Sequence, residues 1–319
     1  MSKTQPPHDD RCWFRIGGIT LEVQADRPIT RQTFAPKFEA FATDRPGGDT
    51  IYIHHRFGLP NLDGRDLGRQ VYRRPPWAVY QSEDAWSYLG IAVDPADTAL
   101  LDFAEFDREH RRGTTYSPSD EHFLHGGLEY LTMAPTDQIV LARVLADRRA
   151  CYLHSAALVV EGAGLLFLGH SGAGKSTIAG LLEGHGQLLC DDRNIVRRWP
   201  DGFRVHGTWS HGDIARVSGA SAPLRAILFL AKSDENRLVR VEDRVRLATT
   251  LAACMIKPVV DAGWWEKSLD LVQSMVNEIP CYEMRFDRSG AIVPALLALA
   301  RLDSLAPPTP DVSLAGDSR

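Results

Sequence analysis

The sequence predicts an α/β protein in two parts: a strand-rich α+β domain over residues 1–148, then a sheet covered by helices over residues 149–305. Before residue 148, short apolar runs are bounded by glycine and polar residues, as in small antiparallel strands. After residue 149, continuous apolar runs typical of buried strands alternate with segments of helical periodicity. One of these runs leads into the glycine-rich stretch GHSGAGKST (169–177), where a helix begins.

In the first domain, the apolar runs at 14–23 flank Gly17 and Gly18, the residue types of a tight hairpin turn. Residues 49–57 alternate as a strand does, and residues 77–91 predict a second hairpin with aromatic residues on both arms. Residues 128–149 predict a helix that is interrupted near Pro135. No catalytic constellation is visible in this domain.

In the second domain, strands are expected at 151–160, 164–168, 187–190, 224–230 and 281–286, with a hairpin over 194–207 that turns at 200–202. Helices are expected at 175–186, 242–257 and 264–279, and after Ser289. The helix over 264–279 is expected to place one apolar stripe on the core: Trp265, Leu269, Val272, Val276 and Ile279. Residues 306–319 are polar and rich in proline, and we expect them to be disordered.

The composition is that of an ordinary globular protein, with 44% hydrophobic and 24% charged residues. A net charge of -5 argues against nucleic acid as a partner, because phosphate contacts need clustered Lys and Arg. No apolar run approaches the ~18 residues that a membrane span needs, so no membrane partner is expected. The five cysteines are scattered singly, which argues against a disulfide framework and a zinc site and favours the reducing cytoplasm.

The stretch 169–177 fits the pattern G-x-x-x-x-G-K-[ST] of a phosphate-binding loop. Its glycines (Gly169, Gly172 and Gly174) let the backbone curl around phosphate oxygens, and four further residues (His170, Ser171, Ala173 and Thr177) complete the loop. Lys175 can reach the β- and γ-phosphates of a nucleotide, and the Ser176 hydroxyl can ligate Mg²⁺. An esterase elbow, G-x-S-x-G, is the alternative. However, Ala173 stands at the fifth position of that motif in place of glycine, and no histidine follows His211 to complete a triad.

Asp191 and Asp192 follow a short strand, soon after the loop helix. Adjacent carboxylates at a strand end are costly unless a cation lies nearby, and in a phosphate-loop protein that cation is Mg²⁺. One carboxylate can hold the metal while the other takes a proton from an incoming hydroxyl. A solvated turn is the simpler alternative for the pair.

Three motifs together resemble the HPr kinase/phosphorylase family, whose nucleotide core is shared with phosphoenolpyruvate carboxykinases. These are His154, the loop GHSGAGKS, and Asp191-Asp192 at a short distance after it. The stretches LHSAALVVEGAGLLFLGHSGAGKST and FRVHGTWSHGD are closer to the branch of that family that includes kinases tailoring lasso peptides. The resemblance covers residues 150–290, and HGTWSHGD stands where HPr kinases carry a longer signature.

The resemblance implies an ATP-dependent kinase that transfers the γ-phosphoryl group to a Ser or Thr hydroxyl of a peptide or protein, with ATP and Mg²⁺. It makes Asp191 the base, Asp192 the Mg²⁺ partner together with Ser176, Lys175 the phosphate clamp, and His154 the neighbour that tunes the acid pair. The first domain would help to hold the acceptor. Because the resembled family assembles as ring-like oligomers, a homo-oligomer is one option.

Two alternatives remain open: a kinase of a small hydroxylated metabolite, and a non-catalytic ATP-binding regulatory module. Loss of the acid pair would leave ATP binding unaffected in the second case. Among weaker signals, His206 and His211 could contact the acceptor, whereas Ala231-Lys232-Ser233-Asp234 is interpreted as a plain strand end.

Overall fold

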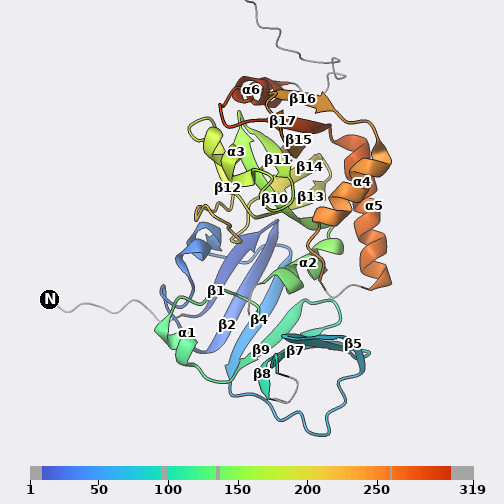
Figure 1. Ribbon diagram of the computed structural model, residues 1–319. Coiled ribbons are helices and arrows are strands. Elements are labelled where there is room, and N and C mark those ends of the chain that lie inside the picture. Colours follow the sequence, from blue (N-terminus) through green and yellow to red (C-terminus); the bar gives the residue numbers. More distant parts are fainter. Residues whose placement is uncertain (1–8, 95–98, 134–136, 259–260, 303–319) are drawn as a thin grey trace, which may run out of the picture. The chain divides into compact units, whose positions relative to one another are not determined.

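The computed structural model describes residues 9–94, 99–133, 137–258 and 261–302. These residues divide into two compact units, each with its own sheet (Figure 1). Unit 1 holds the described residues up to Val144 together with Lys257 and Pro258, and unit 2 holds the others. The division falls within helix α2 (Gln138–Ala146), whereas the sequence placed the boundary after residue 148. The mixed α/β class is confirmed, and the tail at 306–319 lies outside the described residues.

Unit 1 is built on one sheet, which has nine strands within the described residues, in the order β3-β1-β2-β4-β9-β8-β7-β6-β5. The strands are β1 (Asp9–Ile16), β2 (Ile19–Ile29), β3 (Ala42–Thr43), β4 (Thr50–Phe57), β5 (Arg69–Arg74), β6 (Trp77–Gln81), β7 (Ala85–Ile91), β8 (Leu100–Asp107) and β9 (Arg112–Ser117). Neighbours are antiparallel except β2–β4 and β4–β9, which are parallel. A 3-10 helix, η1 (Pro36–Phe41), a short helix, α1 (Glu121–His125), and the part of α2 up to Val144 also belong to this unit.

Both hairpins expected in this unit are confirmed. Strands β1 and β2 turn at Gly17 and Gly18, whose φ angles of 57° and 79° suit glycine in a two-residue hairpin turn. Strands β6 and β7 form the second hairpin. The helix expected over 128–149 was wrong in its first part, because residues 128–133 are not helical and the helix begins only at Gln138. Pro135, where we expected the interruption, lies outside the described residues.

Unit 2 has a sheet of eight strands within the described residues. They are β10 (Ala150–Val160), β11 (Ala163–Leu168), β12 (Gln187–Cys190), β13 (Arg193–Trp199), β14 (Gly202–His206), β15 (Ser221–Lys232), β16 (Arg237–Arg240) and β17 (Cys281–Phe286). The long strands β10 and β15 each pair with β11 and are also linked through β13 and β14, so five strands form a closed ring of pairings. The strands and the hairpin expected here are confirmed.

Helices cover this sheet: α3 (Lys175–Leu181), α4 (Arg244–Cys254), α5 (Ala262–Glu278) and α6 (Val293–Arg301). Helices α4 and α5 lie side by side and share one apolar core with β10 and β13, while α3 and α6 share another with β11 and β15 (Figure 1). Asp243 and Asp261 cap α4 and α5 by accepting the backbone N–H of Arg246 and Trp264. The stripe expected on α5 was wrong at Leu269, which is 50% exposed. The helix instead turns the face that carries Trp264, Leu271 and Met275 toward the core.

The strand directions determine where a ligand could bind in unit 2. Strands β11, β15 and β17 are mutually parallel neighbours, so their carboxyl ends lie at one edge of the sheet. Ligands of such sheets bind at the edge where the strands end. Residues 169–174 follow β11 at this edge, Ser233 follows β15, and Asp287 follows β17.

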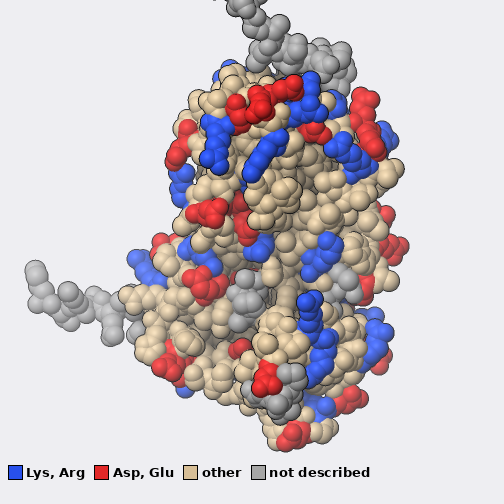
Figure 2. Space-filling model, in the orientation of Figure 1, with Lys and Arg blue, Asp and Glu red and all other residues tan. Residues whose placement is uncertain are grey.

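The surface carries both signs of charge. On the face shown in Figure 2, acidic and basic side chains are interspersed. Among the described residues, no helix is both long enough and apolar enough to cross a membrane.

Candidate functional site

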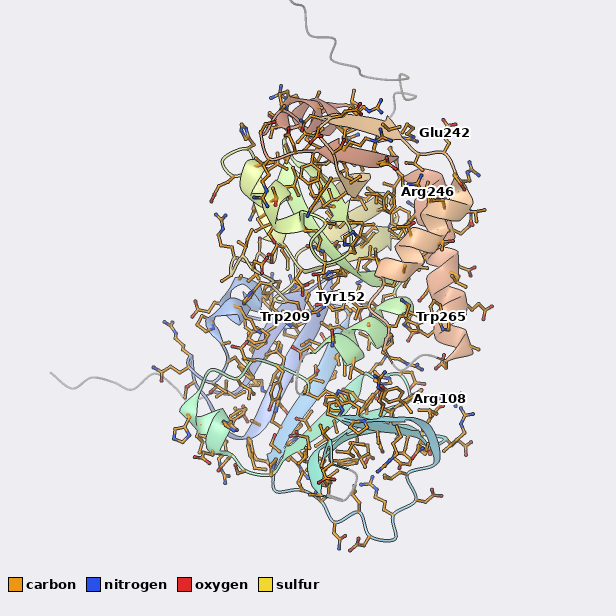
Figure 3. The ribbon with its side chains drawn as sticks, viewed as in Figure 1. Arg108, Tyr152, Trp209, Glu242, Arg246 and Trp265 are labelled. Carbon is orange, nitrogen blue, oxygen red and sulfur yellow. The ribbon has the colours of Figure 1, made fainter. Side chains whose placement is uncertain are left out.

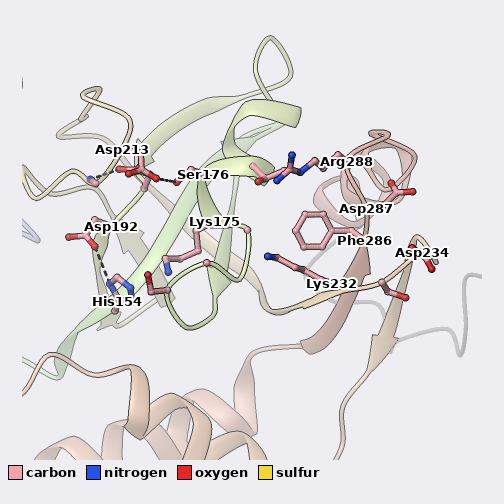
Figure 4. Close-up of a pocket in the computed structure, with 17 residues that line it drawn as sticks. His154, Lys175, Ser176, Asp192, Asp213, Lys232, Asp234, Phe286, Asp287 and Arg288 are labelled. Carbon is pink, nitrogen blue, oxygen red and sulfur yellow. Dashed lines mark hydrogen bonds and ion pairs between the residues drawn. The ribbon is translucent and has the colours of Figure 1, made fainter.

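A cavity of about 820 Å³ opens at this edge of the unit 2 sheet. Six segments line it: His154 from β10, the loop and first turn after β11, Asp191 and Asp192 after β12, Gly212 and Asp213 from the loop after β14, the residues that end or follow β15, and those that end or follow β17. Figure 4 shows Lys175 between two groups of side chains. We call His154, Asp191, Asp192 and Asp213 the acidic end, and Lys232 and Arg288 the cationic end.

The glycine-rich loop joins β11 to α3, as the sequence predicted. Gly174 has φ +109°, and a Cβ there would lie 2.7 Å from the ring of Phe286, so both the backbone and the space require glycine. Six of the predicted loop residues line the cavity: Ser171, Gly172, Gly174, Lys175, Ser176 and Thr177. Gly169, His170 and Ala173 do not line it.

Lys175 is held inside the loop. Its Nζ donates to the backbone oxygens of Gly169 (2.9 Å) and His170 (3.3 Å), and the residue is only 8% exposed. Burial lowers the pKa of Lys175, while the charges of Asp192, Asp191 and Asp213 act in the opposite direction. The three carboxylates are therefore close enough to Lys175 to interact with it through their charges.

Asp192 carries two contacts at the acidic end. The His154 Nδ1 atom lies 3.1 Å from Asp192 Oδ1, and Arg193 Nη1 lies 2.9 Å from Asp192 Oδ2. Burial acts to raise the pKa of Asp192, but the hydrogen bond from His154 and the charges of Arg193 and Lys175 outweigh it and lower this pKa. Asp192 is therefore held as a carboxylate that orients the His154 ring.

Asp191 is more buried than its neighbour, at 3% exposure. Its Oδ1 accepts the backbone N–H of Gly212 at 2.7 Å, and its Oδ2 accepts that of Ile214 at 3.0 Å. The two amides flank Asp213 in the chain. Asp191 thus connects the end of β12 to the loop after β14.

Asp213 was not singled out in the sequence, although it ends the stretch HGTWSHGD. The Ser176 hydroxyl donates to Asp213 Oδ2 at 3.0 Å. The loop after β14 that carries Asp213 is also joined to β10, since the Tyr152 hydroxyl donates to Ser210 Oγ at 2.8 Å. Figure 3 labels Tyr152 and Trp209, the residue before Ser210. No spacing rule in the sequence indicates this contact, because 37 residues separate Ser176 from Asp213.

The cationic end contains residues that the sequence treated as a plain strand end. Lys232 is the last residue of β15, Ser233 and Asp234 follow it, and all three line the cavity. The Lys232 side chain extends toward the loop (Figure 4). Neither Lys232 nor Arg288 forms an ion pair with another described residue.

The two histidines considered as acceptor contacts do not line the cavity. His206 is 7% exposed and accepts the indole N–H of Trp199 at 3.2 Å. Burial lowers the pKa of His206 to about 4, and the charges of Arg204 and Arg197 act in the same direction. His211 is exposed beside Gly212.

The oxygen ligands of the acidic end suit Mg²⁺. Within the part of the chain that the structure describes, no group of three or more His, Cys, Asp or Glu side chains is arranged to hold a metal ion. A nucleotide-bound Mg²⁺ does not require such a cage, because it keeps waters and phosphate oxygens and takes only one or two protein ligands. The hydroxyl of Ser176 and a neighbouring carboxylate meet that requirement.

Comparisons with known proteins give distant structural matches and one family. No curated protein matches the chain. A solved structure, the Hpr(Ser) kinase/phosphatase from Coxiella burnetii, matches 47% of this chain and 88% of its own with 12% identity and a TM-score of 0.28. That TM-score is too low to assign a fold or an activity. The sequence model of the family described as "SynChlorMet cassette protein ScmC" matches residues 123–295, more than half of the chain. The chain therefore belongs to the ScmC family.

Proposed function

We propose that this protein is an ATP-dependent kinase that transfers the γ-phosphoryl group to a Ser or Thr hydroxyl of a peptide or protein. The main support is one arrangement: Lys175 lies within a glycine-rich loop, and the charges of three carboxylates act on it in the same cavity. Phosphoryl transfer depends mostly on positioning and electrostatic stabilisation, and these residue types supply both.

The loop would bind the phosphates. Gly172 and Gly174 give the loop its two left-handed residues, with φ +77° and +109°, and Lys175 exchanges its two carbonyl contacts for the β- and γ-phosphates. Mg²⁺, when bound, neutralises charge on the phosphates, and the Ser176 hydroxyl would hold it with a neighbouring carboxylate. Lys232 and Arg288, which form no ion pair with the described residues, would lie near the phosphates that remain on ADP.

The acidic end would take the acceptor proton. The acceptor oxygen attacks the γ-phosphorus, the bond to the bridging oxygen breaks, and ADP leaves with that oxygen. We assign the proton to His154 Nε2, since Nδ1 faces Asp192, which orients the ring as in other Asp–His pairs. The sequence assigned this role to Asp191, but each Asp191 oxygen already accepts a backbone amide, so Asp191 is engaged in holding the loop after β14.

The class of acceptor is inferred from the sequence resemblance to peptide-tailoring kinases. A transfer assay with γ-labelled ATP and peptides encoded beside the gene tests it. We expect label on Ser or Thr of one such peptide, and roughly 10²- to 10⁴-fold slower labelling with His154→Gln. Label on a small hydroxylated metabolite alone would replace the peptide by that metabolite. ATP binding without transfer to any acceptor would leave a non-catalytic binding module.

A further inference from the structure

We infer that Asp213 is the carboxylate that holds the metal of the bound nucleotide together with Ser176, and that the buried Asp191 positions it. This inference rests on the proposed function. It assigns a role to a loop residue for which the sequence alone gave no indication, and it separates the metal from Asp192.

The contact that indicates this role is the hydrogen bond from Ser176 Oγ to Asp213 Oδ2, 3.0 Å long. In phosphate-loop proteins the metal is held by the loop Ser or Thr together with an aspartate. That aspartate must lie beside the hydroxyl, and Asp213 does so. Because Asp213 is exposed to the cavity, its carboxylate can turn toward an arriving cation or a water bound to it.

Asp192 is less suited to the metal. One of its oxygens faces His154 Nδ1 and the other faces the Arg193 guanidinium. A metal ion at Asp192 would have to displace a positively charged group or lie against it. The same two contacts suit Asp192 to orient His154, so the two carboxylates divide the work.

Asp191 holds Asp213 beside Ser176, although Asp213 lies in a long loop. Its oxygens accept the N–H groups of Gly212 and Ile214, one on each side of Asp213. Such charge-assisted hydrogen bonds inside a protein are strong. The loop is fixed again further along, where Ser218 N donates to Leu189 O at 2.9 Å. Gly212 also packs tightly, since a Cβ there would lie 3.2 Å from Asp191 Oδ2.

The test compares Asp213→Asn with the matched control Asp234→Asn, since both residues are exposed and both line the cavity. Binding of a fluorescent ATP analogue is measured with Mg²⁺ and with a chelator. For Asp213→Asn, we expect the gain in affinity caused by Mg²⁺ to fall about 10- to 100-fold, with unchanged affinity in the chelator. Asp234→Asn should keep the wild-type gain.

The positioning role of Asp191 has its own readout. Amide hydrogen exchange at residues 212 and 214 of the wild-type protein should be slow, and it should be faster in Asp191→Asn. The Asp191→Asn protein should also lose the gain in nucleotide affinity caused by Mg²⁺, as Asp213→Asn does. Fast exchange at both amides in the wild type would overturn the positioning role, even if Asp191→Asn did not fold.

Two outcomes are distinct. If Asp213→Asn kept the full Mg²⁺ gain while Asp192→Asn lost it, the metal would belong to Asp192 and the inference would be wrong. If the wild-type protein bound no nucleotide with or without Mg²⁺, the proposed function itself would be wrong, and the inference with it.

Discussion

Two buried aspartates, one in each unit, hold loops by the same means but with different consequences. In unit 1, Asp137 is 2% exposed and accepts the N–H groups of Leu131 and Thr132 and the Thr132 hydroxyl. In unit 2, Asp191 is 3% exposed and accepts the N–H groups of Gly212 and Ile214. Asp137 binds amides five or six residues before it in the chain, whereas Asp191 binds amides 21 to 23 residues after it.

The comparison shows that a buried aspartate bound to amides is first a structural feature. Only the loop held by Asp191 brings a further carboxylate into a cavity, beside Ser176. Substitution of Asp137 should therefore affect stability alone, whereas substitution of Asp191 should affect both stability and nucleotide chemistry. The following changes test that distinction, from the largest expected effect to the smallest.

His154→Gln is expected to have the largest effect on transfer, because the proposed function makes His154 the base and its side chain contacts Asp192. Loss of a general base lowers the rate by roughly 10²- to 10⁴-fold. Single-turnover transfer of labelled phosphate measures it, and the free energy of unfolding should stay at the wild-type value. An equal loss of stability and activity would show that His154 is structural, like Asp137.

Asp191→Asn and Asp137→Asn are expected to lose similar stability but differ in activity. Asn keeps one acceptor oxygen and loses one charge-assisted hydrogen bond, which costs about 1–3 kcal/mol in each variant. Urea unfolding measures this loss. Only Asp191→Asn should also reduce the Mg²⁺-dependent affinity for nucleotide. A folded Asp137→Asn protein that lost this affinity as well would remove the distinction between the two aspartates.

The stability contributions of two carboxylates, Asp137 in unit 1 and Asp192 in unit 2, should also respond to pH in opposite directions. Burial raises the pKa of Asp137 above its ordinary 3.8, although hydrogen bonds from Thr132 and Leu131 oppose the rise. The ionised Asp137 carboxylate therefore destabilises the fold progressively as the pH rises from 3.8 through the raised pKa of Asp137. For Asp192 the pKa lies below 3.8, so its stabilisation is complete above 3.8 and is lost as the pH falls through the lowered value.

Unfolding free energies of the wild type and of Asp137→Asn and Asp192→Asn, measured across this pH range, would show the two trends. The advantage of the wild type over Asp192→Asn should shrink as the pH falls. Its advantage over Asp137→Asn should grow as the pH falls through the raised pKa of Asp137 to 3.8, which is above the interval in which the Asp192 contribution is lost. Parallel trends would contradict the opposite surroundings of the two carboxylates.

The smallest expected effects come from one glycine of the loop and one of helix α3. Gly174→Ala introduces a side chain at φ +109° and 2.7 Å from the buried Phe286, and should cost about 1–2 kcal/mol. Gly180→Ala lies in α3 with nothing within 4 Å, and should stabilise the protein by about 0.5–1 kcal/mol. Thermal unfolding distinguishes the two variants, and equal shifts would contradict the strain at Gly174.

The sequence predicted local features well where one pattern controls them. The hairpin at Gly17-Gly18, the strand before the loop and the helix after it all depend on neighbouring residues. The helix expected at 128–133 was wrong because this segment instead donates its amides to Asp137, a contact that helical periodicity does not reveal.

The site was predictable only in part, for the same reason. The loop and the acid pair are recognisable as short motifs, but the partners of Asp191 lie in a distant loop and carry no motif. Lys232 and Arg288 reach the cavity because β15 and β17 are parallel neighbours, which is a property of the sheet and not of the local sequence. Residues brought in by topology therefore required the structure.

The central claim is that Lys175 and the carboxylates around it form one nucleotide site. Calorimetric titration of the wild-type protein and of Lys175→Ala with ATP and Mg²⁺ tests it most directly, with the exposed Lys267→Ala as control. We expect the wild type and the control to bind ATP equally, and Lys175→Ala to bind about 10- to 100-fold more weakly, the value of one hydrogen bond to a charged group. Unchanged affinity in a folded Lys175→Ala protein would contradict the account.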